Sequence, residues 1–177
     1  MAKQDVPYTC CFGEVMKVLT DTGLLLASKD ANDRPNAMTI GWGTIGSVWG
    51  KPLWIVLVRP SRYTYQCIEK TGDFTVNVPP PALKEAVLFC GTKSGRDFDK
   101  FATANLTALP GRSVNVPVIE ECVVNYECRV VHHNDIIPSE LAGEIQNSAY
   151  KSGDYHRVYF GEILETYADP DAAARLG

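Results

Sequence analysis

The chain has 177 residues, of which 45% are hydrophobic and 21% charged, a composition that suits one globular domain with a sizeable core. A formal net charge of -4 argues against a nucleic-acid-binding protein, since such proteins present a basic face to phosphates. The apolar runs are too short to span a membrane, and the N-terminus lacks the charged-then-apolar pattern of a secretory signal. We therefore expect one cytoplasmic domain over residues 1–177, with a core at about 11–167, a peripheral tail at 168–177, and no membrane or nucleic-acid partner.

Strand-like runs dominate the chain. In order, they are Leu24–Ser28, Asn36–Trp42, Leu53–Val58, Phe74–Val78, Cys122–His133, Gly143–Ala149 and Tyr155–Tyr167. Turn-rich stretches at 30–35 and 151–154 suit hairpins between the first two and the last two runs. Helical signals are fewer, and fall after Ser61, over Pro81–Phe89, and after Ser94, whose spacing to Asp97 resembles a capping box. This pattern predicts a mainly β fold, an antiparallel barrel with two or three inserted helices.

The segment Asn36–Trp42 places small and large side chains on opposite faces of its strand. The small set is Ala37, Thr39 and Gly41, and the large set is Met38, Ile40 and Trp42. The small face would leave the backbone open to a planar ring, while the large face packs in the core. An ordinary core strand is the plainer interpretation, and the two are compatible.

The run Gly41–Gly46 matches the letters of the dinucleotide fingerprint G-x-G-x-x-G. That fingerprint requires a helix to open at the glycines within a strand-helix-strand unit. The following residues, 47–52, have the composition of a loop instead. We therefore reject a Rossmann site here.

A strand followed by a helix is predicted around residue 60. The apolar run Leu53–Val58 has strand length, and Pro60 bars its continuation as a central strand. Residues 63–70 then show helical periodicity, and Gly72 is placed to end the helix. Ser61 fits the N-cap of this helix.

The start of this helix has the residue types of a phosphate site. The free amides of the first turn, the helix dipole and the Thr64 hydroxyl would face one point. Arg59 and Arg62 add bidentate donors suited to a phosphate. The alternative is that Ser61 only caps a surface helix and both arginines are solvated.

The six cysteines, at positions 10, 11, 67, 90, 122 and 128, include no C-x-x-C pair, which argues against zinc and thioredoxin-like chemistry. Free thiols in a reducing compartment are expected. Cys122 and Cys128 would share the apolar face of one strand, which predicts burial. Cys90 precedes the loop 91–96, where both an inert thiol and a redox thiol stay open.

No metal site is expected from the three histidines. His132 and His133 are adjacent on one predicted strand and therefore point to opposite faces. His156 lies beside Arg157 in the last strand, where we expect a surface position.

With these residues in place, the chain resembles the flavin reductase-like family of FMN-binding split barrels, and within it the flavoredoxin and archaeal ferric reductase branch. The likeness runs from about residue 11 to residue 167. It rests on the order and spacing of Asn36–Trp42, Arg59–Thr64, Gly72–Pro79, Cys90–Phe101 and Tyr159–Ile163. The resemblance implies an antiparallel split β-barrel and a homodimer with FMN near the subunit interface.

The same resemblance implies the cofactor-binding residues. Around the isoalloxazine it places Asn36, Ala37, Met38, Thr39, Ile40, Gly41 and Trp42. Around the phosphate it places Arg59, Ser61, Arg62, Tyr63 and Thr64, with Ser94 and Lys100 as weaker candidates. No catalytic side chain is named, because the cofactor carries the hydride chemistry.

The implied activity is hydride transfer from NADH or NADPH to flavin, followed by electron transfer to a small-molecule or protein acceptor. FMN could serve as a prosthetic group or as an exchanging substrate. Two alternatives stay open, namely a flavoredoxin-like carrier reduced by a protein partner and a flavin-binding module without turnover.

Overall fold

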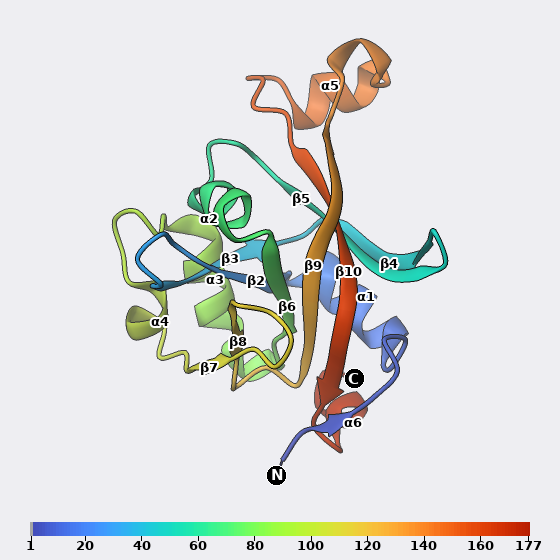
Figure 1. Cartoon of the computed structure of the whole chain (residues 1–177). Coiled ribbons are helices and arrows are strands. Elements are labelled where there is room, and N and C mark those ends of the chain that lie inside the picture. The colour runs from blue at the N-terminus through green and yellow to red at the C-terminus, as the bar shows by residue number, and fades with distance from the viewer. Residues whose placement is uncertain (1) are drawn as a thin grey trace.

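A computed structural model describes residues 2–177, and Figure 1 shows the arrangement of its elements. An eight-stranded antiparallel sheet dominates it. Its strands are β1 (Gln4–Asp5), β2 (Leu24–Lys29), β3 (Pro35–Ile40), β4 (Gly43–Val48), β5 (Lys51–Val58), β6 (Asp73–Val78), β9 (Val124–Asp135) and β10 (Arg157–Ala168). Two short strands, β7 (Ala108–Pro110) and β8 (Pro117–Ile119), pair separately.

Helices surround this sheet. They are α1 (Phe12–Asp21), α2 (Tyr63–Thr71), α3 (Lys84–Thr92), α4 (Lys100–Thr103), α5 (Gly143–Ala149) and α6 (Ala172–Leu176), with 3-10 turns at Pro81–Leu83 and Pro138–Glu140. Within residues 2–177, no helix is both long enough and apolar enough to cross a membrane.

The sheet closes on itself as a split barrel. Its strand order is β3-β2-β6-β9-β10-β5-β4, with β1 added beside β10. The two end strands, β3 and β4, are consecutive in the chain and are joined by Gly41 and Trp42 alone. Because so short a link spans at most about 11 Å, the two ends of the sheet must lie close together. The predicted fold, a mainly β antiparallel split barrel, is confirmed, although the structure has more helices than predicted.

Alternation along the strands gives the barrel two apolar cores. On β2, Leu24 and Leu26 face the interior, where Trp54 and Tyr126 also pack. Leu25 and its neighbour Ala27 face outward into a second cluster beneath α3 and α4. These two helices therefore cover the outer face of β2 and β3, as Figure 1 shows.

The segment that carries the false dinucleotide fingerprint forms a hairpin. Residues Gly43–Val48 are β4, which pairs with β5, so no helix opens at these glycines and the rejection of a Rossmann site is confirmed. The prediction of a loop over residues 47–52 is wrong. The hairpin turns through only two residues, Trp49 and Gly50, whose φ angles of 55° and 71° match the positive values of a type I′ turn. Tryptophan at the first position hides this signal, since Asn or Asp is usual there.

Two other predictions near the C-terminus are wrong. The run Gly143–Ala149 is the helix α5, because residues 136–156 leave the barrel between β9 and β10, where a strand would have no neighbour. A helix satisfies its own backbone groups in that position. The tail is not peripheral, since Ala172 and Leu176 are buried in the main core.

The buried positions of Cys122 and Cys128 are confirmed, and all six cysteines are free. They do not share a strand face, however. Cys122 precedes β9 and packs in the core beneath α3, whereas Cys128 faces the barrel interior.

The outer face of β9 is polar yet buried. The carboxylate of Glu127, which is 0% exposed, accepts the N–H groups of Arg112 at 2.8 Å, Ser113 at 2.6 Å and Val114 at 3.2 Å. It also accepts the Tyr167 hydroxyl at 2.8 Å. This one side chain therefore fastens the connection between β7 and β8 to the barrel.

Candidate functional site

A cavity of about 370 Å³ lies where the end of β3, the end of β5, the start of α2 and the end of α3 meet. This volume is within the range of small-molecule sites. Five cationic side chains line it, namely Arg59, Arg62, Lys93, Arg96 and Lys100. Among residues 2–177, no Asp or Glu side chain lines it. The cavity therefore favours an anionic ligand.

The cavity brings the two predicted segments together. Its lining includes Met38, Thr39, Ile40, Gly41, Trp42, Arg59, Ser61, Arg62, Tyr63, Thr64, Ser94 and Lys100. Of the predicted residues, Asn36 and Ala37 lie behind this lining instead. The Asn36 amide donates a hydrogen bond to the buried Thr64 hydroxyl at 2.9 Å, so it supports the lining from below.

The small face of β3 meets the cavity only in part, since Thr39 and Gly41 line it and Ala37 does not. Ala37 packs in the core beneath α3, and the Thr39 hydroxyl donates to the Val87 carbonyl at 2.5 Å. What β3 offers is its backbone edge, because it ends the strand order. Lys100 binds the Ala37 carbonyl on this edge at 2.8 Å, and strand alternation places the N–H and C=O of Thr39 on the same side. The backbone edge of β3 therefore adds hydrogen-bonding groups to the part of the small face that lines the cavity, and a flat ligand on this face stays a prediction.

The helix α2 begins one residue later than predicted. Arg62 is its N-cap, and Ser61 does not cap it. The Ser61 hydroxyl instead donates to the Asp154 carboxylate at 2.6 Å. The Tyr63 hydroxyl donates to the buried carboxylate of Asp30 at 3.0 Å, which fixes the first turn. The strand, proline and helix order that predicted an amide-rich helix start is nevertheless present.

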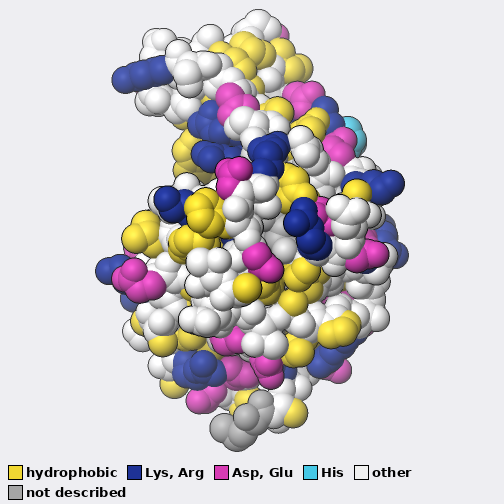
Figure 2. All heavy atoms as spheres, turned by 90° about the vertical axis from the view of Figure 1, so that its left-hand side faces the viewer, with side chains coloured by type: hydrophobic (Ala, Val, Ile, Leu, Met, Phe, Trp, Pro, Cys, Tyr) yellow, Lys and Arg dark blue, Asp and Glu magenta, His cyan; other side chains and the backbone are white. Residues whose placement is uncertain are grey.

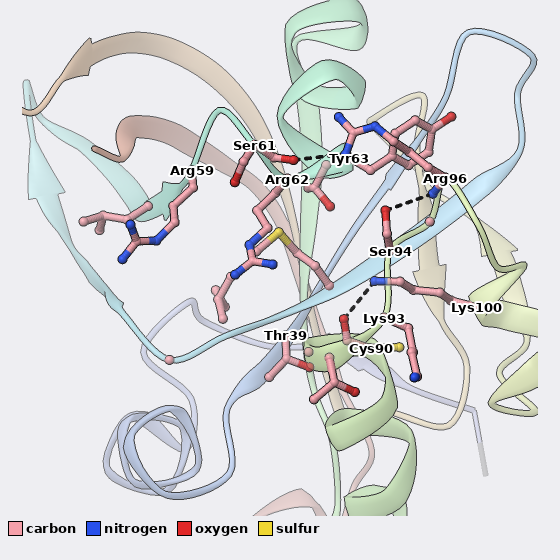
Figure 3. Close-up of a pocket in the computed structure, with 18 of the residues that line it drawn as sticks. Thr39, Arg59, Ser61, Arg62, Tyr63, Cys90, Lys93, Ser94, Arg96 and Lys100 are labelled. Carbon is pink, nitrogen blue, oxygen red and sulfur yellow. Dashed lines mark hydrogen bonds between the residues drawn. The ribbon is translucent and has the colours of Figure 1, made fainter. Parts of the chain in front are cut away.

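The cationic side chains of the lining differ in how they are engaged. Arg62 extends into the middle of the pocket in Figure 3. It forms no ion pair with any carboxylate of residues 2–177. Arg96 donates to the Ser61 carbonyl at 3.0 Å and lies over the Tyr63 ring. Arg62 is thus the guanidinium best placed to bind a ligand anion.

Arg59 and Lys100 are committed to main-chain carbonyls. Arg59 donates to Ala149 at 2.9 Å and to Asp154 at 2.8 Å, and it lies apart from Arg62 in Figure 3. Arg59 lines the cavity nevertheless, and its role as a phosphate ligand stays a prediction. The Lys100 ammonium donates to the carbonyls of Ala37 and Cys90, both at 2.8 Å, and burial lowers its pKa. The Lys100 side chain, at the start of α4, therefore links α3 to β3.

Gly95 lets the loop 93–96 close against the start of α2. A Cβ added there would lie 2.1 Å from Oδ1 of Asn36 and 2.8 Å from the Tyr63 ring. The predicted capping box at Ser94 is absent, since Asp99 caps α4 by accepting the Ala102 N–H at 3.0 Å. The Ser94 hydroxyl accepts the Arg96 N–H at 3.2 Å and lines the cavity.

His156 is a cavity residue that the sequence did not reveal. It is 9% exposed, which overturns the expected surface position. The Tyr150 hydroxyl and Nδ1 of His156 share a hydrogen bond of 2.8 Å, and the Trp42 ring centroid lies 5.2 Å from the imidazole centroid. Burial and the nearby Arg59 lower the pKa of His156 to about 4. The imidazole is therefore neutral at physiological pH.

This lowered pKa predicts a pH dependence of stability. Because the pKa of His156 is about 4 in the folded chain and 6.5 in the reference state, its contribution is present above pH 6.5 and is lost as the pH falls towards 4. We expect His156→Gln to flatten the decline in the free energy of unfolding over this window. Denaturant titrations of both proteins from pH 4 to pH 8 would measure it, with His132→Gln as the control. Parallel profiles for wild type and His156→Gln would contradict the prediction.

The part of the chain that the structure describes contains no group of three or more His, Cys, Asp or Glu side chains placed to hold a metal ion. The two histidines on β9 both lie near aromatic rings of β10: His132 lies near Phe160 and also near Trp49 of the β4–β5 turn, and His133 lies near Tyr159.

Comparison with known proteins gives a consistent set of matches. A family model described as flavin reductase like domain matches residues 15–176. An uncharacterized protein of Archaeoglobus fulgidus is 34% identical over 138 residues, which cover 77% of this chain and 68% of that relative. The flavoredoxin of Desulfovibrio vulgaris (Miyazaki F) superposes with a TM-score of 0.69 and 28% identity, covering 84% of this chain and 70% of that one. For a flavoredoxin from Methanosarcina acetivorans the TM-score is 0.68 and the identity 26%, with coverages of 85% and 70%.

Proposed function

The chain belongs to the flavin reductase-like family, and on that basis we propose that it is an FMN-binding oxidoreductase that accepts hydride from NADH or NADPH and passes electrons to an acceptor. The family membership agrees with the motifs of the sequence and supports a flavin-related redox role. The observation that carries the proposal is the cavity at the open seam of the barrel. This cavity has the cationic start of α2 at one end and the rings of Trp42 and His156 at the other.

The donor set of this cavity fits FMN, which combines a phosphate with a flat, largely apolar ring. Arg62, the hydroxyls of Thr64 and Ser94, and the first-turn amides of α2 are donors of the kind that bind phosphate. At the other end, Trp42 and the neutral His156 provide an aromatic wall beside the edge of β3. A ligand that consisted of phosphate alone would leave this aromatic half of the cavity without a contact.

We assign each predicted residue a role on this basis. The ring would be bordered by Met38, Thr39, Ile40, Gly41 and Trp42, and the phosphate held by Arg62, Tyr63, Thr64 and Ser94. Supporting positions would be taken by Asn36, Ala37, Arg59, Ser61 and Lys100. Bound FMN supplies the hydride and electron chemistry, and the protein supplies position and polarity.

We extend the proposal to a cytoplasmic homodimer that reduces a small-molecule or protein acceptor. Trp42 is 48% exposed beside the cavity, where a second copy of the chain would shield it from water. The six free thiols fit a reducing compartment.

The proposed donor chemistry can be tested by colour. Protein loaded with FMN is expected to lose its visible flavin absorption when mixed with NADH or NADPH under nitrogen, and to recover it in air. Reduction by dithionite serves as the control that the bound flavin is reducible. Persistent colour with both nicotinamides would favour the second candidate, a flavoredoxin-like electron carrier, to which the two flavoredoxin matches point. Failure to take up FMN would contradict both.

A further inference from the structure

Asp154 joins the segment before β10 to the loop that precedes α2. Its carboxylate accepts the Ser61 hydroxyl at 2.6 Å and the Ser61 N–H at 3.3 Å. From the same loop, Arg59 donates back to the carbonyls of Ala149 and Asp154. These contacts lie between residues 90 or more positions apart in the sequence. We call this set of contacts the 59–154 latch.

The latch fixes groups on both sides of the cavity. Figure 3 shows the Ser61 hydroxyl on the side of Arg59, whereas the Ser61 carbonyl points towards Arg96 on the opposite side. Ser61 is thus held from two directions, and the residue that follows it is Arg62. At the other end of the latch, Asp154 lies two residues before His156. The hydrogen-bond partner of His156 is Tyr150, and the Arg59 guanidinium lies over the Tyr150 ring, 5.1 Å from its centroid.

The backbone at the latch also supports a specific role for this side chain. Gly153 and Asp154 have φ angles of 77° and 56°, so the turn enters the left-handed region twice. Asp tolerates this region better than most residues, and glycine adopts it freely. In Figure 2 the part of the molecule that carries α5 stands out over a hollow, with Lys and Arg side chains beneath it. The latch connects that part to residues 59–61, in the loop that precedes α2.

We propose that Asp154 is a positioning residue for phosphate binding, which acts through Ser61 to hold Arg62 and the first turn of α2 in place. This inference rests on the proposed binding of FMN in the cavity. It assigns Ser61 a role different from that of a direct phosphate ligand, since its hydroxyl is already donated to Asp154. Because the Asp154 carboxylate acts on Ser61, at the phosphate end of the cavity, its removal should weaken the binding of FMN more than that of riboflavin, which lacks the phosphate.

The test compares the affinities of the flavin-free protein for FMN and for riboflavin. Asp154→Gly removes the carboxylate and keeps the left-handed backbone, and we expect it to raise the Kd for FMN about tenfold while leaving that for riboflavin unchanged. Asp154→Asn keeps one acceptor oxygen and should have a smaller effect. Ser61→Ala should resemble Asp154→Gly, and the double variant should be no worse than either single one. Asp171→Asn, at an exposed carboxylate outside the site, is the control for charge.

The possible outcomes separate this inference from the proposed function. Wild-type protein that binds neither flavin would contradict the proposed function itself. If the wild type binds FMN, the inference is overturned by unchanged FMN affinity in Asp154→Gly, by equal losses for both flavins, or by additive effects of the two substitutions. Tighter FMN binding by Asp154→Gly would also overturn it, since the carboxylate would then compete with the phosphate.

Discussion

Replacing Arg62 with Ala is expected to weaken FMN binding by roughly 10- to 150-fold, the equivalent of one charge-assisted contact of about 1.5 to 3 kcal/mol. Arg62 lines the cavity, extends into it, and pairs with no carboxylate of residues 2–177. Its loss therefore removes a ligand contact without breaking an internal ion pair. Titration of flavin-free protein with FMN, followed by quenching of flavin fluorescence, gives the two dissociation constants.

The contrast with riboflavin decides what the Arg62 result means. Riboflavin affinity should stay within about twofold of wild type, because the lost contact is to the phosphate. Arg62→Lys should recover only part of the FMN affinity, since an ammonium keeps the charge but loses the bidentate fork. Arg175→Ala, on α6, is the control for a lost surface guanidinium. Equal weakening for FMN and riboflavin would mean that Arg62 acts on the ring or on the fold, and an unchanged FMN affinity would place the phosphate elsewhere.

Local rules predicted the parts of the site that depend on neighbouring residues. The apolar run before Pro60, the proline itself and the helical period after it gave β5, the break and α2 in the right order. The same rules placed β3 correctly and excluded a helix at Gly41. These features follow from backbone restrictions and side-chain periodicity, which act over a few residues.

The errors in the site came from contacts that are distant in sequence. Ser61 looks like a helix cap because its neighbours suit one, yet its hydroxyl is donated to Asp154, which lies 93 residues away. The sequence also does not show that carbonyls 90 and 95 residues away accept N–H groups of Arg59. His156 looks exposed because no periodic pattern buries it, and its burial depends on Trp42 at the seam of the barrel. A polar side chain has several possible hydrogen-bond partners, and the tertiary fold determines which of them it meets.

The largest expected effect on stability belongs to Glu127, far from the cavity. Its two oxygens accept two hydrogen bonds each: Oε1 from Arg112 and Tyr167, and Oε2 from Ser113 and Val114. Glu127→Gln keeps the shape, but either orientation of the amide turns an N–H₂ group towards two donors. Two donors would then lose their acceptor, one of them buried, namely the Tyr167 hydroxyl or the Val114 N–H.

We expect Glu127→Gln to lower the free energy of unfolding by roughly 2 to 6 kcal/mol, from about 1 to 3 kcal/mol for each donor left unsatisfied. For a domain of this size the middle of that range corresponds to a fall in Tm of roughly 10 °C. Urea unfolding followed by tryptophan fluorescence measures the change, and Trp54 in the barrel core is a suitable reporter. Glu165→Gln is the matched control, since Glu165 accepts only the Ser113 hydroxyl among the same loop residues and should cost less than about 1 kcal/mol. Equal losses in the two variants would mean that the loop is held by its other contacts, among them the Asn115 N–H bond to Asp73 and the Arg129 bond to the Ser113 carbonyl. A loss confined to Glu127→Gln would show that the buried Glu127 carboxylate fastens the β7–β8 connection to the barrel.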